Sequence, residues 1–217
     1  MTPDLIIFDC DGVLVDSEPV SNRLLVDNLA RHGLSLTFDE AMGLFIGGTM
    51  AGVGEKARSL GADLPDDWVD EIYAETYAKL REGVDPIPGI PALLDQLDTV
   101  GLPYCVASNG SEEKMGITLG STGLAPRFDG RRYSAHTLRV AKPDPGLFLH
   151  AAADLGVDPA KCLVVEDSPT GAEAARRAGM PCFGYAPEGD GARLAAKGAQ
   201  IIRDMAEIPA LIGIQAA

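Results

Sequence analysis

Hydrophobic and polar positions fall into two alternating patterns along most of this chain. Short apolar runs that are typical of buried strands alternate with longer stretches of helical periodicity. Continuous apolar strands separated by helices indicate a parallel sheet that is covered on both faces, so we predict an α/β fold with three layers. The predicted strands are Leu5–Asp9, Tyr104–Ser108, Cys162–Glu166, Cys182–Tyr185 and Gln200–Ile202, and the predicted helices are Ile90–Leu97, Glu112–Leu119, Pro145–Leu155 and Thr170–Ala178.

The interval between the first two strands has helical periodicity only. Four helices are predicted there, and the second begins with a capping-box pattern at Thr37 and Glu40. A segment rich in Gly and Pro, residues 83–89, then has the composition of a linker. We therefore expect a small helical domain, 17–82, inserted into an α/β domain made of 1–16 and 83–217.

The composition narrows the classes of partner. The 217 residues carry a formal net charge of −14, which repels nucleic-acid phosphates and anionic membrane surfaces. No apolar run approaches the roughly 18 residues of a membrane span, and the first residues lack the pattern of a signal peptide. The four scattered cysteines fit buried, reduced thiols. We expect a cytoplasmic protein, a monomer or weak homodimer, without nucleic-acid or membrane partners.

Polar side chains gather where the predicted strands end. Two aspartates follow the first strand, a serine and an asparagine close the second, and an acidic pair ends the third. One lysine stands before a predicted helix between the last two groups. Because ligands of parallel sheets bind at the carboxyl ends of strands, we expect these groups to meet. They are Asp9 and Asp11, Ser108 and Asn109, Lys142, and Glu166 and Asp167.

These residue types favour phosphoryl-transfer chemistry. Carboxylates without histidine suit Mg²⁺, and hydroxyl, amide and ammonium donors suit a phosphate. In that chemistry Asp9 attacks phosphorus and forms an aspartyl-phosphate. Asp11 protonates the leaving oxygen and then deprotonates the attacking water. Lys142, with Ser108 and Asn109, stabilises the charge on the phosphoryl oxygens.

Each pattern alone also has an ordinary structural interpretation. Two aspartates before a glycine occur in surface turns, Ser108-Asn109-Gly110 is a common turn sequence, and Lys142 before a proline fits a solvated loop. The acidic pair fits a helix N-terminus. All four interpretations would have to hold independently, whereas one shared site explains the four patterns together.

The sequence resembles the haloacid dehalogenase-like phosphohydrolases over essentially its whole length. Asp9-Cys10-Asp11-Gly12-Val13 resembles the first motif of that family, Ser108 in Val106-Ala107-Ser108-Asn109-Gly110 the second, and Lys142 in Lys-Pro-Asp-Pro the third. Glu166-Asp167 resembles the fourth. The resemblance implies a Rossmann-like core with an inserted α-helical cap.

The same resemblance implies a metal site and roles for the motif residues. It implies that Mg²⁺ is held by the Asp9 carboxylate, the Asp11 backbone carbonyl and Asp167, with Glu166 in support. It also implies that Asp9 is the nucleophile and Asp11 the acid/base. Branches of the family that cleave carbon–halogen or phosphonate bonds lack an Asp at the position of Asp11, so we expect a phosphoric monoester hydrolase.

The closest subgroup resembles the β-phosphoglucomutases and sugar-phosphate phosphatases. In the segment that matches the specificity loop of the mutases, Gly47, Gly48 and Thr49 are candidates for substrate contact because a glycine-rich turn lets backbone approach a ligand. Ile46 and Met50 stand where a mutase is expected to carry Lys and Arg, and Ser21 where it carries His. A mutase needs positive charge for a second phosphate, so hydrolysis is favoured.

We therefore expect a phosphatase for a small phosphomonoester, such as a sugar or sugar-acid phosphate. Members of the 6-phosphogluconate phosphatase type resemble the chain most in the motif segments. A phosphomutase on the same core and a non-enzymatic binding module are the alternatives. Product analysis separates the first alternative, and the intact set of motif residues speaks against the second.

Overall fold

The computed structural model describes residues 2–45 and 49–214 of the chain. The chain forms two compact units, one made of Met1–Asp16 with Asp85–Ala217 and the other of Ser17–Val84. The first unit is α/β and the second is helical. The predicted α/β fold with a helical insertion is confirmed.

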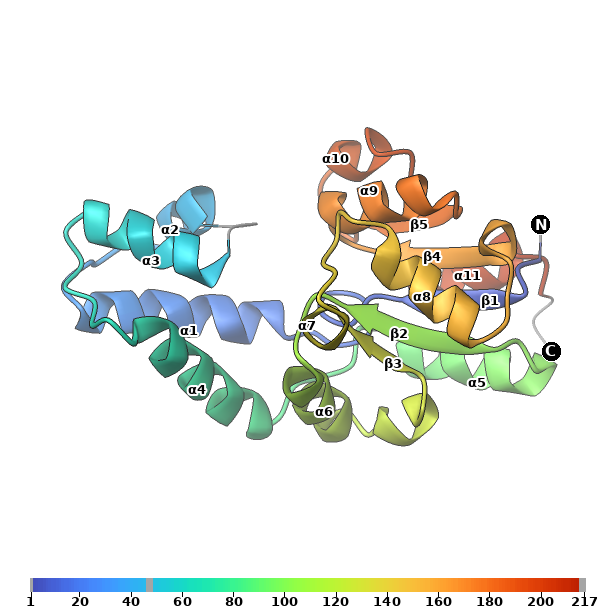
Figure 1. The fold of residues 1–217 in the computed structure, drawn as a ribbon, viewed down its shortest axis with the longest axis horizontal. Coiled ribbons are helices and arrows are strands. Elements are labelled where there is room, and N and C mark those ends of the chain that lie inside the picture. Colours follow the sequence, from blue (N-terminus) through green and yellow to red (C-terminus); the bar gives the residue numbers. More distant parts are fainter. Residues whose placement is uncertain (1, 46–48, 215–217) are drawn as a thin grey trace. The chain divides into compact units, whose positions relative to one another are not determined.

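The α/β unit is built on a parallel sheet of six strands in the order β3-β2-β1-β4-β5-β6. Figure 1 labels five of them, β1 to β5. All five predicted strands are present within a residue of their expected bounds. The short edge strand β3 was not predicted, because it has only three residues and its first side chain is exposed. The bounds are β1 Leu5–Phe8, β2 Tyr104–Ser108, β3 Arg132–Ser134, β4 Cys162–Glu166, β5 Cys182–Tyr185 and β6 Gln200–Ile202.

Both faces of this sheet are buried, as the continuous apolar strands predict. Leu5 and Ile7 on β1 face a core formed with helices α8 and α9, while Phe8 points to the other face and packs edge-on against Tyr104. The helices of the unit are α5 Ile90–Val100, α6 Glu112–Ser121, α7 Ala135–Leu138, α8 Gly146–Asp154, α9 Pro169–Ala178, α10 Ala192–Ala195 and α11 Ile208–Leu211, with 3₁₀ turns at Ala125–Phe128, Pro159–Lys161 and Met205–Glu207.

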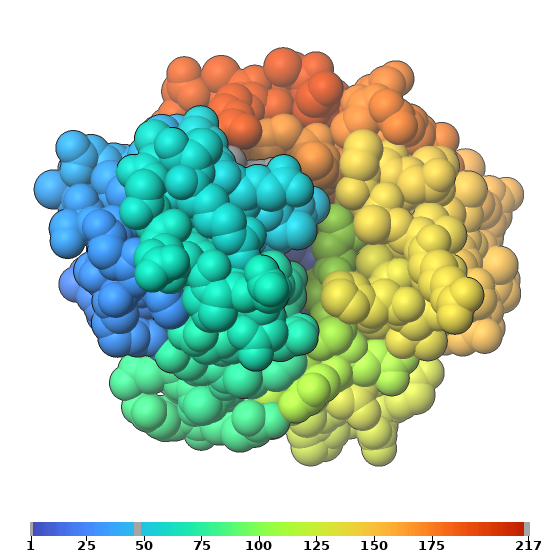
Figure 2. Space-filling view, turned by 60° about the vertical axis from the view of Figure 1, so that its left-hand side comes forward, coloured from blue at the N-terminus to red at the C-terminus, as the bar shows by residue number. Residues whose placement is uncertain are grey.

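The helical unit packs around its own apolar core, and Figure 2 shows its surface in blue to green. Within this core Trp68 is fully buried, and its indole N–H donates to the side-chain oxygen of the buried Asn28 at 2.7 Å. Thr37 and Glu40 form the reciprocal bonds of the predicted capping box. The four helices are α1 Glu18–Arg31, α2 Phe38–Phe45, α3 Met50–Ser59 and α4 Trp68–Arg81.

Two findings bear on the expectations drawn from composition. The four cysteines are buried and form no disulfide. Among the helices of the described ranges, none combines the length and the apolar character that crossing a membrane requires.

Asn28 supplies a direct test of the helical unit. Asn28→Ala removes the acceptor for the buried Trp68 N–H, and an unsatisfied buried donor costs about 1–3 kcal/mol. We expect that loss in the free energy of unfolding, measured by the fluorescence of Trp68, the single tryptophan of the chain. Asp27→Ala on the exposed side of α1 is the matched control, and an equal loss in both variants would contradict the assignment.

Candidate active site

The predicted site residues lie at the carboxyl ends of neighbouring strands of the α/β unit. Asp9 follows β1, Ser108 ends β2 and Glu166 ends β4, and each of them is buried together with Lys142. The strands β2 and β4 both pair with β1, so their ends lie side by side. This sheet order explains why residues more than 150 positions apart in the chain meet.

Lys142 connects two of these carboxylates. Its ammonium Nζ donates to Asp9 Oδ1 at 2.7 Å and to Glu166 Oε1 at 2.6 Å. The backbone of the lysine is held in turn by Asn109, whose side-chain oxygen accepts from the Lys142 N–H at 2.8 Å and whose amide donates to the Lys142 carbonyl. The Asn109 side chain therefore orients the lysine from the loop that follows β2.

The carboxylate of Glu166 is completely buried and both of its oxygens are engaged. Besides Lys142 on Oε1, the oxygen Oε2 accepts from the backbone N–H groups of Asp167 and Ser168 at 3.1 and 3.0 Å, and from the Ser168 hydroxyl at 2.8 Å. Ser168 is also the N-cap of α9. Glu166 thus fixes Lys142 and the start of α9 relative to β4.

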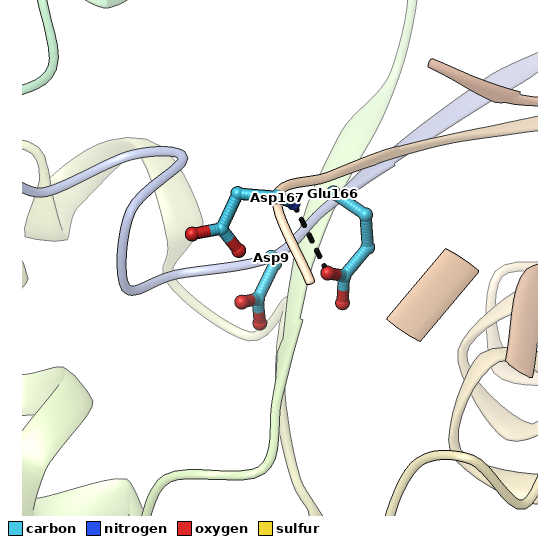
Figure 3. Close-up of side chains that lie close together, drawn as sticks. All are labelled: Asp9, Glu166 and Asp167. Carbon is cyan, nitrogen blue, oxygen red and sulfur yellow. Dashed lines mark hydrogen bonds between the residues drawn. The ribbon is translucent and has the colours of Figure 1, made fainter. Parts of the chain in front are cut away.

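The side chains of Asp9, Glu166 and Asp167 lie close together (Figure 3). Each offers one carboxylate oxygen, and these oxygens lie within 4.8 Å of one another. Asp167 lies against Gly12, which has a φ of +75°. A Cβ at Gly12 would lie 2.0 Å from Asp167 Oδ2, so the glycine provides both the turn and the space. The cluster therefore depends on the absence of a side chain at position 12.

The charges in this cluster do not balance. The buried ammonium of Lys142 pairs with Asp9 and Glu166, and a carboxylate oxygen of Asp167 lies within 4.8 Å of those of both residues. Burial raises the pKa of Asp9 from 3.8 to about 7, although Lys142 opposes that shift. Burial also opposes the charge on Lys142, but Asp9 and Glu166 hold the pKa of the lysine above its ordinary value. A divalent cation would offset this excess negative charge.

The donor set fits a hard cation. The cluster offers carboxylate oxygens, and no histidine or cysteine belongs to it among the described residues. Mg²⁺ prefers oxygen ligands and uses only one or two protein carboxylates. Since both oxygens of Glu166 are already engaged, Asp9 and Asp167 are the carboxylates best suited to such an ion.

Asp11 and Ser108 lie on the side of the site next to α6. Asp11 Oδ2 is 2.9 Å from the ammonium of Lys114, a residue of α6. Burial opposes the charge on Lys114, but the Asp11 carboxylate holds the pKa of this lysine above its ordinary value. The Ser108 hydroxyl oxygen accepts from the Gly110 N–H at 2.9 Å. The two aspartates of the first motif therefore face different lysines.

Three residues of this arrangement were not predicted from the sequence. They are Lys114, Gly171 on α9, where a Cβ would lie 1.8 Å from Glu166 Oε1, and Ser134, whose hydroxyl donates to the Gly110 carbonyl at 2.7 Å. Gly171 stands three residues after the N-cap Ser168, a spacing that could have indicated contact with the end of β4. Lys114 and Ser134 have no comparable local signal.

Of the candidate substrate contacts in the helical unit, the structure describes Thr49. Gly47 and Gly48 lie outside the described residues, as does Ile46. Thr49 is the N-cap of α3, and its hydroxyl oxygen accepts from the Gly52 N–H at 3.2 Å. Ser21 donates its hydroxyl to the Ser17 carbonyl. Thr49 and Ser21 thus each have a local structural role.

A separate groove of about 650 Å³ lies beside the edge strand β3. Arg132, Tyr133, His150 and Asp154 line it, and none of the motif carboxylates does. Its mixed charges favour no single ligand, so the acidic cluster remains the candidate site.

Gly171 provides a test of this geometry that needs no ligand. In Gly171→Ala the new methyl group collides with the fully buried Glu166 carboxylate. We therefore expect the free energy of unfolding to fall by about 1–3 kcal/mol. Gly116→Ala is the matched control, because it lies in α6 with nothing within 4 Å of the added Cβ. There the change should stabilise the helix by about 0.5–1 kcal/mol. Chemical denaturation measures both, and equal effects would contradict the packing.

Known proteins share both the sequence and the fold. Residues 3–179 match the family model described as haloacid dehalogenase-like hydrolase. The 6-phosphogluconate phosphatase of Escherichia coli (strain K12) is 31% identical over 182 residues, which cover 83% of this chain and 81% of that protein. The chain spans only 19% of SUPPRESSOR OF QUENCHING 1 from Arabidopsis thaliana, to which it is 34% identical over 206 residues, 92% of its own length.

A solved structure extends this likeness to nearly the whole chain. A HAD family hydrolase from Deinococcus radiodurans R1, with bound phosphate and sodium, superposes with a TM-score of 0.83 at 32% identity and covers 99% of this chain and 98% of that one. The family match, the relatives and the shared fold agree. This chain belongs to the haloacid dehalogenase-like hydrolase family.

Proposed function

We propose that this chain is a Mg²⁺-dependent phosphatase that hydrolyses a small phosphorylated metabolite through an aspartyl-phosphate intermediate. The chain is a phosphoric monoester hydrolase by its family and its phosphatase relatives. The observation that supports the mechanism most strongly is the ion pair between the buried Lys142 and Asp9 at the end of β1. The carboxylate of Asp9 lies beside that of Asp167.

In this proposal Asp9 is the nucleophile. A carboxylate oxygen of Asp9 forms a bond to phosphorus while the bond from phosphorus to the alcohol oxygen breaks. Asp11 gives a proton to that leaving oxygen. A water then attacks phosphorus, Asp11 takes a proton from it, and Asp9 is released with inorganic phosphate. Two of the three N–H groups of Lys142 serve Asp9 and Glu166, and the third is assigned to a phosphoryl oxygen.

Ser108 and Asn109 complete the proposed phosphate site. The Ser108 hydroxyl accepts from Gly110, so its own proton can be donated to a phosphoryl oxygen. Asn109 acts mainly through Lys142, whose backbone it holds on both sides. Donors fixed in this way stabilise charge in the transition state without reorganisation.

The proposed metal ligands are the carboxylates of Asp9 and Asp167 and the backbone carbonyl of Asp11. When bound, Mg²⁺ supplies positive charge between the Asp9 carboxylate and the phosphoryl group, which otherwise repel each other. Glu166 is assigned a supporting role, because its two oxygens are engaged by Lys142, Asp167 and Ser168.

The proposed substrate is a sugar phosphate or sugar-acid phosphate. The support comes from the likeness to a 6-phosphogluconate phosphatase and from the departures at Met50 and Ser21 from the mutase pattern. The helical unit is proposed to act as the cap that selects the alcohol part of the ester. Product analysis on a hexose 1-phosphate tests the mutase alternative: inorganic phosphate supports hydrolysis, and an isomeric sugar phosphate contradicts it.

Replacing the nucleophile should abolish turnover without unfolding the protein. Asp9→Asn keeps the shape of the side chain but removes the attacking carboxylate, so we expect phosphate release to fall at least about 10³-fold. Release is measured with a panel of phosphomonoesters at fixed Mg²⁺. Asp129→Asn, at an exposed position of the same unit, should retain full activity. Rapid phosphate release by Asp9→Asn would exclude the proposed nucleophile.

The metal site is tested without turnover by thermal unfolding. A cation that binds only the folded protein stabilises it by about 2.7 kcal/mol at one hundred times its dissociation constant. We expect Mg²⁺ to raise the melting temperature of the wild type and of Asp129→Asn. In Asp167→Asn this increase should largely disappear, since one proposed ligand is lost. A full Mg²⁺ response in Asp167→Asn would argue against the proposed ligand set.

A further inference from the structure

Lys114 belongs to none of the motif segments, yet it reaches the site from α6. It lies in the first turn of that helix, where its backbone N–H donates to the hydroxyl of the N-cap Ser111 at 3.1 Å. Its side chain is only 22% exposed, and its ammonium lies 2.9 Å from Asp11 Oδ2. The side chain of Lys114 therefore pairs with Asp11 rather than extending into solvent.

The packing around Gly110 shows how closely these groups approach one another. A Cβ placed at Gly110 would lie 3.3 Å from Ser108 Oγ, 3.6 Å from Asp11 Oδ2 and 3.6 Å from Lys114 Cδ. The hydrocarbon stem of Lys114 therefore lies beside the loop that carries Ser108, and its charged end reaches the residue after β1. Through this contact α6 holds Asp11 next to the proposed phosphate site.

The two lysines of the site have separate partners. Lys142 contacts Asp9 and Glu166, and Lys114 contacts Asp11. Asp11 lies beyond the end of β1 and directly before the turn at Gly12, so the strand itself does not fix its side chain. The ion pair with Lys114 on α6 restrains the Asp11 side chain.

We propose that Lys114 is a positioning residue that orients the Asp11 carboxyl group for proton exchange with the leaving oxygen and with the attacking water. This inference rests on the proposed function. In the first step the electron pair of the breaking bond stays on the alcohol oxygen, which takes the proton of Asp11. The demand for that proton depends on the leaving group, since a nitrophenolate departs without protonation and a sugar alkoxide does not.

This difference gives a readout that a purely structural role would not produce. Lys114→Met keeps the packing of the stem and removes the charge. We expect its kcat/KM to fall about 10- to 100-fold on a sugar phosphate that the wild type hydrolyses, and less than about 3-fold on p-nitrophenyl phosphate. With p-nitrophenyl phosphate, rapid-quench experiments should also show more phosphoenzyme than in the wild type, because its formation is little affected whereas water attack needs Asp11 as base.

Three further variants make the result specific. Lys161→Met removes an exposed ion pair with Asp4 in the same unit and should leave both kcat/KM values unchanged. Lys114→Arg keeps a cation and should recover part of the loss on the sugar phosphate. In Asp11→Asn with Lys114→Met, the two losses should not multiply, because the lysine acts through the aspartate. Thermal unfolding checks that each variant is folded.

Two results would overturn the proposal. An equal loss on both substrates, with a weaker affinity for inorganic phosphate, would make Lys114 a phosphate ligand or a structural residue. Unchanged kcat/KM values in Lys114→Met would show that Lys114 has no role in the reaction. Neither result affects the proposed function. That function fails if the wild type with Mg²⁺ releases no phosphate from any phosphomonoester of the panel, and the Lys114 variants do not enter that measurement.

Discussion

The buried ammonium of Lys142 is the contact on which the rest of the site depends. The strands β1 and β4 are adjacent and pair in the register Phe8 with Val165, so Asp9 and Glu166 follow at the same edge of the sheet. Two buried carboxylates side by side repel each other unless a cation lies between them. Lys142 supplies that cation, and removing it would leave two buried charges uncompensated, which costs several kcal/mol.

The cluster also needs space, and two glycines provide it from opposite directions. Gly12 leaves room for the Asp167 carboxylate and adopts the positive φ of the turn after β1. Gly171, in the first turn of α9, leaves room for the Glu166 carboxylate. The carboxylates of this site therefore fit only because positions 12 and 171 carry no side chain. An alanine at either position would collide with a carboxylate.

The sequence predicted the elements that carry strong local patterns. Continuous apolar runs located β1, β2 and β4, and those strand ends located Asp9, Ser108 and Glu166 because parallel strands end at one edge. Their chemical roles remain predictions. The edge strand β3 was missed because three residues carry too little pattern.

Contacts that depend on how a helix is docked were also out of reach of the sequence. Lys114 lies about one helical turn after Ser111, and nothing in the local sequence shows that this turn faces Asp11 rather than solvent. Gly171 differs, because its spacing from the N-cap Ser168 could have indicated contact with the end of β4, although the direction of the Glu166 side chain could not be predicted. Which charged side chains pair depends on how the helices pack in the tertiary structure, whereas the ends of strands can be predicted from the local sequence.

The charges of the site explain how an acidic protein can hold an anionic ester. The chain carries a net charge of −14, which opposes the approach of a phosphate. With Asp11 protonated, as the proposed first step requires, the carboxylates of Asp9, Glu166 and Asp167 exceed the two ammonium groups of Lys114 and Lys142 by one negative charge. A bound divalent cation would leave the site with one positive charge. The phosphoryl group would then meet local positive charge and oriented donors, and the negative charge of the rest of the protein would act on it only over longer distances, where salt screens it.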